Sequence, residues 1–255
     1  MKYVSLTFDD GRGDNYQFVF PTMKKYGLTG TLFCTTGYVD GTWEKDKTWY
    51  SAGEPLTVQE VIRLKEEGWE IGLHGDKHTT SVSDMQVANQ KMKAWGIVQE
   101  KIGFSIPNSN VAKEDLDNFK AAYLGNAINY IRTGRRRSTR KITSKILFVL
   151  YTYLGMQWAY NRFNNINLNH IEQADKSNLY SVVVRCEDQS EMVQRFIEQM
   201  PDNAWVVLMF HSILPKEHEL YKSDPWNWCV DDFEKLCEFL SGREDVVVKN
   251  VADIV

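Results

Sequence analysis

The residues Val4-Ser5-Leu6-Thr7-Phe8-Asp9-Asp10-Gly11 decide how this chain of 255 residues is interpreted. An apolar-rich run leads directly into two adjacent carboxylates and a glycine. Neighbouring side chains in a strand point to opposite faces, but at the end of a strand both carboxylates can address one pocket. Burying two adjacent acids requires a cation, a shared proton or a metal. Because Asp-Asp-Gly is also a common composition for a solvated turn, the rest of the chain has to decide between a site and a turn.

The composition is that of an ordinary globular protein. Hydrophobic residues make up 43% and charged residues 25% of the chain, and the net charge is -4. A general nucleic-acid binder is normally basic, so we expect no nucleic-acid partner. The sequence contains no run of the roughly 18–20 apolar residues that a membrane span needs, which predicts no stable membrane insertion. The N-terminus lacks the pattern of a secretory leader, and no Cys-x-x-Cys pair occurs, so we expect a cytoplasmic protein with free thiols.

Strand-like and helix-like segments alternate along the chain. Strands are predicted at residues 2–8, 30–36, 69–73, 102–106, 127–131, 180–185, 205–210 and 246–248. Helices are predicted at residues 14–26, 57–67, 83–100, 114–123, 142–158, 190–200 and 231–240. This alternation predicts an α/β fold with a parallel sheet and helices outside it, and a single domain of this size favours a closed or nearly closed barrel. We expect one domain over residues 1–255 with an insertion at about 133–178.

Polar residues follow three of the predicted strands. Asp9 and Asp10 end the first strand, His74 follows the third with His78 four residues later, and His211 follows the seventh. Active sites of such barrels lie at the C-terminal ends of the strands, so we expect these side chains to meet at one mouth. A lone histidine more often has a packing or hydrogen-bonding role. The coincidence of these residues at equivalent strand ends favours a functional site.

The residue types at this mouth predict a metal centre. Two imidazoles and one carboxylate with open positions suit zinc or another first-row divalent ion, such as cobalt or nickel. A metal held in this way polarises a carbonyl and lowers the pKa of bound water toward ~7. The second carboxylate is then free to act as a general base, and a histidine from the far side can protonate the leaving group. We therefore expect metal-assisted hydrolysis of an amide or an ester.

Three motifs resemble those of the polysaccharide deacetylase (NodB-homology, carbohydrate esterase family 4-like) family. Thr7-Phe8-Asp9-Asp10-Gly11 matches the first motif of this family. His74-Gly75-Asp76-Lys77-His78 resembles its second motif, His-Ser/Thr-x-x-His-Pro, and Leu208-Met209-Phe210-His211 resembles its Leu-x-His motif. The order, spacing and strand context of the motifs agree from residue 2 to about 250, apart from the insertion.

This resemblance implies a fold, a set of residue roles and a substrate class. The fold is a distorted (β/α)7 barrel of the NodB-homology type. The implied roles are Asp9 as the catalytic base, Asp10, His74 and His78 as metal ligands, and His211 as the catalytic acid. The implied reaction is removal of an acetyl group from an acetylated carbohydrate, by a hydrolase that acts on carbon–nitrogen bonds other than peptide bonds.

The sequence departs from the pattern of the family in its second and third motifs. Thr79 stands where the second motif has proline, and Asn108 where the third motif has tyrosine. Ser105 stands where the third motif has an arginine that tethers the catalytic base. Some relatives without this arginine carry an Arg-Thr pair at the end of the next strand, which Arg132-Thr133 resembles. We hypothesise that Arg132 tethers Asp9 as a catalytic-site residue and stabilises its charged form; the alternative is a solvent-facing arginine.

The fourth motif of the family, Asp-x-x-Asp-Trp, supports the acid histidine and is not evident in this chain. Glu187 or Asp188 is the best substitute that the sequence offers. Aromatic residues such as Trp49, Tyr50 and Trp226 have two interpretations, because they can stack on a sugar ring or pack beneath their own loops.

The insertion begins with basic residues and continues with an apolar helix. Arg135-Arg136-Arg137 and Arg140-Lys141 precede that helix, a pattern compatible with an anionic partner or a membrane surface. A solvated loop that leads into a helix covering the barrel or a dimer partner is the more common arrangement. The sequence is therefore compatible with a homo-oligomer and does not decide the oligomeric state.

The leading hypothesis is a metal-dependent hydrolase that removes an acetyl group from an N-acetylated or O-acetylated sugar. One alternative is an amidase or deformylase that acts on a small, non-polymeric substrate, which a cytoplasmic location favours over a cell-wall polymer. Another is a catalytically impaired barrel that only binds carbohydrate, an interpretation that the incomplete third and fourth motifs keep open. Metal content and acyl release distinguish these three hypotheses.

Overall fold

The structure, a computed structural model, describes residues 1–43, 53–109, 113–136 and 141–255. Trp49, Tyr50, Arg137 and Arg140, which the sequence analysis singled out, lie outside the described residues.

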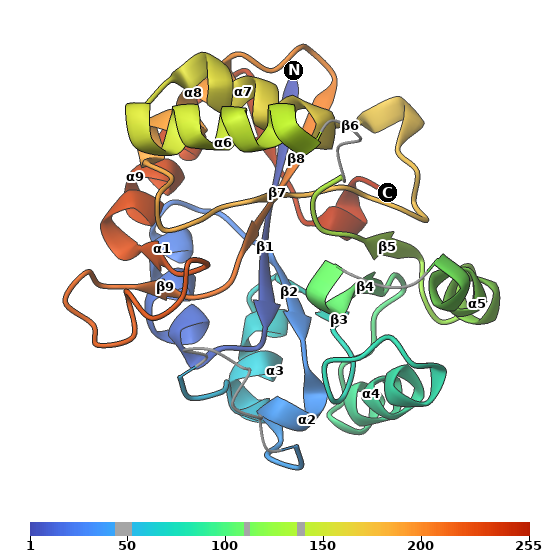
Figure 1. Ribbon diagram of the computed structural model, residues 1–255. Helices are drawn as coiled ribbons and strands as arrows, with labels where there is room; N and C mark the ends of the chain where they lie inside the picture. The colour runs from blue at the N-terminus through green and yellow to red at the C-terminus, as the bar shows by residue number, and fades with distance from the viewer. Residues whose placement is uncertain (44–52, 110–112, 137–140) are drawn as a thin grey trace.

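A curled, mainly parallel sheet forms the centre of the molecule (Figure 1). Its path runs β5-β4-β3-β2-β1-β8-β6, while β11 pairs with β1 and β7 with β8. The strands are β1 (Lys2–Asp10), β2 (Thr31–Cys34), β3 (Glu70–Leu73), β4 (Gly103–Ser105), β5 (Tyr130–Arg132), β6 (Asn169–His170), β7 (Val182–Val183), β8 (Ala204–Phe210) and β11 (Val246–Val248). Within this sheet only β6 pairs in the antiparallel direction among the described residues. The parallel sheet that the sequence predicts is therefore confirmed.

Helices cover the outside of the sheet. They are α1 (Phe20–Lys25), α2 (Thr36–Val39), α3 (Val58–Glu66), α4 (Val82–Ala94), α5 (Lys113–Tyr123), α6 (Lys141–Leu154), α7 (Gln157–Asn164), α8 (Ser190–Glu198) and α9 (Val230–Ser241). A small parallel pair, β9 (Ile213–Leu214) and β10 (Trp228–Cys229), follows β8. The helix α3 begins with a capping box, in which Thr57 and Glu60 bond to each other's backbone amides.

The central strand β1 separates two apolar clusters. Val4, Leu6 and Phe8 belong to the larger cluster, where Phe8 stacks on Phe210 with ring centroids 5.4 Å apart. A second cluster contains Phe33, Tyr130, Leu179, Trp205, Val207 and Val251. Ser5 alternates with the apolar residues of β1 and accepts a hydrogen bond from the indole nitrogen of Trp205 at 3.0 Å. The alternation of β1 therefore directs every second residue, including Asp9, to the inner side of the curled sheet.

Two long predicted helices are shortened or divided in the structure, and a glycine explains each of these two differences. The helix predicted over residues 83–100 ends at Ala94, before Gly96 adopts a φ of 77°. The helix predicted over residues 142–158 is divided into α6 and α7 at Gly155, whose φ is 61°. Left-handed backbone at a glycine is a common way to end a helix. The assignment of residues 1–255 to one domain with an insertion at about 133–178 stays a prediction.

Replacing Gly103 with alanine is expected to destabilise the sheet. Gly103 pairs in register with Tyr130, and a Cβ atom on Gly103 would overlap the tyrosine ring. The hydroxyl of Tyr130 donates a hydrogen bond to Glu70 at 2.5 Å, which restrains the ring. We expect Gly103→Ala to lower the free energy of unfolding by about 1–3 kcal/mol in urea denaturation, as overpacking does. Gly242→Ala is the matched control, since its nearest atom would lie at an ordinary 3.5 Å; equal stability of both variants would contradict this packing.

Candidate active site

The two adjacent acids at the end of β1 lie in a buried site. Asp9 and Asp10 are each 3% exposed, so the solvated-turn interpretation of Asp-Asp-Gly is wrong. Asp10 has a φ of 80°, a conformation that residues other than glycine seldom adopt and that is concentrated at functional sites. The strand ends at this residue, and the strict alternation of side chains ends with it. His74 Nε2 therefore lies near both carboxylates, 3.9 Å from Asp9 Oδ2 and 3.4 Å from Asp10 Oδ1.

Asp10, His74 and His78 present three donor atoms that suit a divalent metal. Asp10 Oδ1 lies 3.4 Å from His74 Nε2 and 3.5 Å from His78 Nε2, and one ligand atom from each residue lies within 4.8 Å of the others. Ligands about 2.0–2.1 Å from a tetrahedral zinc ion are separated by about 3.3 Å. The donor set, two imidazole nitrogens and a carboxylate oxygen, and its spacing therefore fit zinc or a similar ion.

Neighbouring groups orient both histidines. His74 Nδ1 lies 2.9 Å from the carbonyl oxygen of Ser105, an arrangement that directs Nε2 toward Asp10. His78 lies in a loop held by the carboxylate of Asp84, which accepts hydrogen bonds from three backbone amides: Asp76 at 2.9 Å, Lys77 at 2.9 Å and Thr79 at 3.3 Å. Asp84 therefore fixes the loop in which the proline of the family's second motif is replaced by Thr79.

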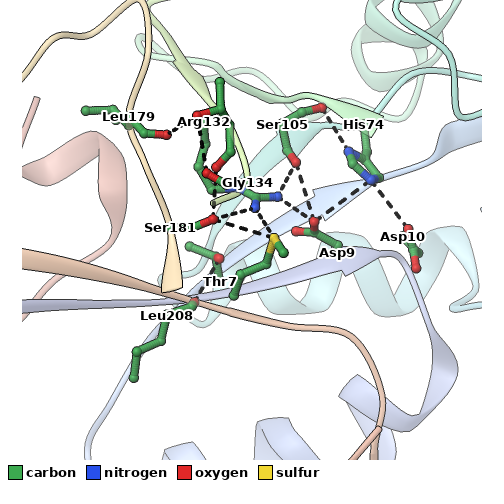
Figure 2. A network of polar contacts seen from close by, with 12 residues as sticks. Thr7, Asp9, Asp10, His74, Ser105, Arg132, Gly134, Leu179, Ser181 and Leu208 are labelled. Atoms are coloured by element: carbon green, nitrogen blue, oxygen red, sulfur yellow. Dashed lines mark hydrogen bonds and ion pairs between the residues drawn. The ribbon is translucent and has the colours of Figure 1, made fainter. Parts of the chain in front are cut away.

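Arg132 forms an ion pair with Asp9 in the interior of the molecule, and Figure 2 shows its guanidinium between the sheet strands. Nη2 of Arg132 donates to Asp9 Oδ2 and to Ser105 Oγ, and Nη1 lies near Ser181 Oγ and Met209 Sδ. The guanidinium also lies 5.0 Å from the ring centroid of Phe33. Arg132 is 1% exposed, so it is not a solvent-facing arginine.

The position of Arg132 follows from the register of two adjacent strands. Ser105 on β4 is paired in register with Arg132 on β5. Serine is too short to contact Asp9 closely, and its hydroxyl lies 3.5 Å from Asp9 Oδ2. The small side chain leaves room for the arginine of the neighbouring strand. Asp9 Oδ1, by contrast, is buried without a hydrogen-bond partner among the described residues, so it is free to accept a proton.

Arg12 neutralises the second carboxylate. Its guanidinium donates to Asp10 Oδ2 at 2.8 Å from both Nε and Nη2, and its Nη1 donates to Ser212 Oγ at 2.9 Å. Burial alone would raise the pKa of Asp10, but Arg12 and hydrogen bonds from the two histidines hold that pKa well below its usual range. Arg12 occupies one oxygen of Asp10 and leaves Oδ1 facing the imidazoles.

The segment that carries His211 is attached to the turn after β1. Asp14 Oδ2 accepts a hydrogen bond from the amide of Ile213 at 2.7 Å, and Asn15 Nδ2 donates to the carbonyl of His211 at 3.0 Å. Burial lowers the pKa of His211, while the nearby carboxylates of Asp10 and Asp9 oppose this effect. The ring of Trp226 lies 5.9 Å from the ring of His211, centroid to centroid.

Neither acid proposed to support His211 contacts it in the described part of the chain. Asp188 accepts a hydrogen bond from the amide of Arg185 at 2.9 Å, and burial raises its pKa to about 7. Glu187 accepts from Arg185 Nε at 3.3 Å. Nδ1 of His211 is buried without a hydrogen-bond partner among the described residues. The hypothesis that Glu187 or Asp188 supports the acid histidine is therefore not supported.

Comparison with known sequences gives the family. Residues 1–115 match the family model described as polysaccharide deacetylase. The N-terminal part of the chain is therefore similar to the polysaccharide deacetylase family. YxkH, a Bacillus subtilis (strain 168) protein assigned to the polysaccharide deacetylases, is 56% identical over 32 residues, which is 12% of this chain and 12% of that protein. The resemblance that the three motifs predict is thus confirmed over residues 1–115.

Solved polysaccharide deacetylase-like structures share the fold over nearly the whole chain. The Xyl-CE4 domain of a multidomain xylanase from the hindgut metagenome of Trinervitermes trinervoides has a TM-score of 0.53 and 13% identity, and covers 99% of this chain and 89% of that chain. A family 4 acetyl xylan esterase from Clostridium thermocellum in complex with a cobalt ion has the same TM-score and coverage at 14% identity. Peptidoglycan deacetylase PdaC from Bacillus subtilis has a TM-score of 0.50 and 14% identity, with the same coverage. These likenesses confirm the predicted distorted (β/α)7 barrel.

Sequence reasoning missed three contributors to this site. Arg12, Asp14 and Asp84 are buried or partly buried polar residues that position other groups. Arg12 and Asp14 follow the first motif by one and three residues, and Asp84 follows the second motif by six. Their nearness to the motifs was the available signal, but a charged residue in a turn is usually solvated.

Removing Arg12 is expected to destabilise the metal-free protein strongly. Arg12→Leu leaves the charge of Asp10 buried without its cation, and removing one partner of a buried pair costs roughly 3–5 kcal/mol. Denaturant unfolding in the presence of a chelator measures this loss. Arg243→Leu is the matched control, because Arg243 pairs with Asp245 at the surface, where ion pairs contribute much less. Similar losses in the two variants would contradict the assigned role of Arg12.

Proposed function

We propose that the chain is a metal-dependent deacetylase that hydrolyses the acetyl group of an N-acetylated or O-acetylated sugar. The observation that carries this proposal is that the two adjacent acids have different partners. Asp10 faces two imidazoles, while Asp9 pairs with Arg132 through one oxygen and keeps the other oxygen free. One carboxylate is thereby suited to holding an ion and the other to accepting a proton.

The ion that we propose at Asp10, His74 and His78 is zinc, with cobalt and nickel as alternatives. When bound, it would supply Lewis-acid polarisation of the acetyl carbonyl and a lowered pKa of water. Two observations support this ion site. The donor atoms have a suitable spacing, and the backbone carbonyl of Ser105 lies within hydrogen-bond distance of His74 Nδ1.

The residues of the chain divide the proton transfers between them. Asp9 Oδ1 accepts the proton of the attacking water, and Arg132 orients the carboxylate. His211, in its protonated form, donates a proton to the departing amine or hydroxyl. Because burial lowers the pKa of His211, the imidazolium gives up its proton readily. The hydrogen bonds from Asn15 and Asp14 fix the backbone that carries this imidazole.

An acetylated carbohydrate is the substrate class that we propose. Similar structures include an acetyl xylan esterase and a peptidoglycan deacetylase, so both ester and amide linkages belong in the test. Trp226 lies beside His211 and offers a flat apolar surface on which a sugar ring can stack.

Acyl release from a panel of acylated sugars tests the function. Metal-stripped protein is assayed for acetate and formate release with and without added zinc, cobalt or nickel, together with the Asp9→Asn variant. We expect metal-dependent acetate release that falls roughly 10²–10⁴-fold in Asp9→Asn, since a general base contributes by that order. Release of formate alone would favour the deformylase alternative, and sugar binding without turnover the impaired barrel. Turnover that survives both chelation and Asp9→Asn would refute the mechanism.

Arg132 is expected to act on turnover rather than on substrate affinity. Arg132→Met removes the cation beside Asp9, and we expect kcat to fall on the order of 10–100-fold with little change in KM, as for loss of a catalytic orienting group. Arg132→Lys keeps the charge and should recover part of this loss. Arg136→Met is the control, because Arg136 is exposed and stacks on Tyr180, with its guanidinium 4.2 Å from the ring centroid. If Arg132→Met has the same kcat as the unaltered protein, Arg132 does not tether Asp9.

A further inference from the structure

The insertion carries a strong positive charge of its own. No acidic residue occurs between Thr133 and Ile171, although the net charge of the whole chain is -4. The seven basic residues of this segment are Arg135, Arg136, Arg137, Arg140, Lys141, Lys145 and Arg162. Uniform positive charge of this kind attracts an anionic partner and repels a second copy of itself.

The helix α6 is packed on other helices by one side only. Its buried Tyr151 contacts the rings of Tyr160 and Phe163, both at 5.2 Å between centroids. Tyr160 on α7 in turn contacts Phe196 of α8 at 5.9 Å. Figure 1 shows α6 alongside α7 and α8 at the top of the view. The helix α6 therefore packs on α7, which in turn packs on α8.

The other side of α6 presents large apolar side chains to solvent. Among the described residues, six of the ten exposed large hydrophobic side chains lie on α6 and the start of α7: Ile142, Ile146, Val149, Tyr153, Leu154 and Trp158. The first four follow the spacing i, i+4, i+7 and i+11, which places them on one face of a helix. We call these six residues the apolar face. Exposed clusters of this type mark surfaces that bind another molecule or a membrane.

Basic residues border the apolar face. Lys141 and Lys145 are exposed in the first two turns of α6, and tyrosine and tryptophan occur toward its end and at the start of α7. Lysines around an aliphatic and aromatic face are typical of helices that lie in the interface of an anionic bilayer. An apolar face without charges would favour a second copy equally, but the charge of this segment distinguishes the two occupants.

A cavity of about 190 Å³ opens between α6 and the end of α7. Its polar lining is Arg135, Arg162, Thr143 and Ser144, and its apolar lining is Leu147, Phe163 and Ile166. Arg135 Nη2 donates to the carbonyl of Phe163 at 3.2 Å, while its Nε is buried without a hydrogen-bond partner in the described part of the chain. Guanidinium groups and hydroxyls are the usual ligands of a phosphate. The cavity therefore suits the phosphate of a lipid headgroup.

We propose that the α6–α7 hairpin docks on the surface of an anionic phospholipid bilayer. The apolar face enters the interface, Lys141 and Lys145 contact headgroups, and the cavity at Arg135 and Arg162 accepts a lipid phosphate. The 14 residues of α6 extend over about 21 Å, so the helix lies along the surface. No helix within the described ranges has the length and apolar content to cross a membrane. The docking is independent of the deacetylase chemistry proposed above.

Vesicle binding by the purified full chain tests this docking. Flotation is measured with vesicles of phosphatidylcholine alone and of phosphatidylcholine with about one third phosphatidylglycerol. We expect binding to the anionic vesicles only, and weaker binding as salt is raised. Lys141→Gln/Lys145→Gln should bind roughly 25-fold more weakly, since each of the two basic residues near an anionic surface contributes about fivefold. Ile146→Glu/Tyr153→Glu should reduce binding by at least roughly tenfold, because it removes apolar area from the interface.

Val98→Glu is the matched control, since Val98 is 78% exposed and lies outside the hairpin. Its vesicle binding should equal that of the unaltered protein, and circular dichroism should give the same helix content for every variant. Absence of binding to anionic vesicles, or equal binding of Ile146→Glu/Tyr153→Glu, would overturn the proposal. A dimer in light scattering that Ile146→Glu/Tyr153→Glu converts to a monomer, without vesicle binding, would assign the apolar face to a second copy instead.

Discussion

Two negative charges on adjacent residues cannot share one buried pocket unless each has its own compensation. The end of β1 satisfies this constraint by giving Asp9 and Asp10 separate cations, Arg132 from β5 and Arg12 from the following turn. Like charges so close together would otherwise raise one pKa strongly and leave one acid protonated. Each carboxylate therefore keeps one oxygen for a different partner, the imidazoles for Asp10 and an unpaired position for Asp9.

The origin of the cation beside Asp9 illustrates how a charge can move within a fold. The resemblance to the family places the tethering arginine on the strand that here carries Ser105. In this chain the charge comes from the paired position of the next strand, and serine lines the space that the arginine crosses. What the pocket requires is a guanidinium beside Asp9, held among buried neighbours such as Phe33. Which strand supplies this guanidinium matters less than its position beside Asp9.

The sequence predicted the parts of the structure that depend on periodicity and on motif order. The parallel sheet and the gathering of Asp10, His74 and His78 follow from strands that end in polar residues. Arg12 was not predictable, because its partners are Asp10 in a left-handed turn and Ser212, 200 residues away. The division of the insertion into α6 and α7 was missed because one glycine, Gly155, decides it against an otherwise continuous apolar pattern.

The two ends of the insertion meet beside Arg132. The amide of Thr133 donates to the carbonyl of Leu179 at 2.7 Å, and Ser181 Oγ donates to the carbonyl of Thr133 at 2.9 Å. A segment that leaves and re-enters a fold at nearly one point can change length or composition without displacing its anchor. In the divergence of related chains, the segment between Thr133 and Leu179 is thus free to vary while Arg132 stays beside Asp9. A new surface can evolve there at little risk to the chemistry of the site.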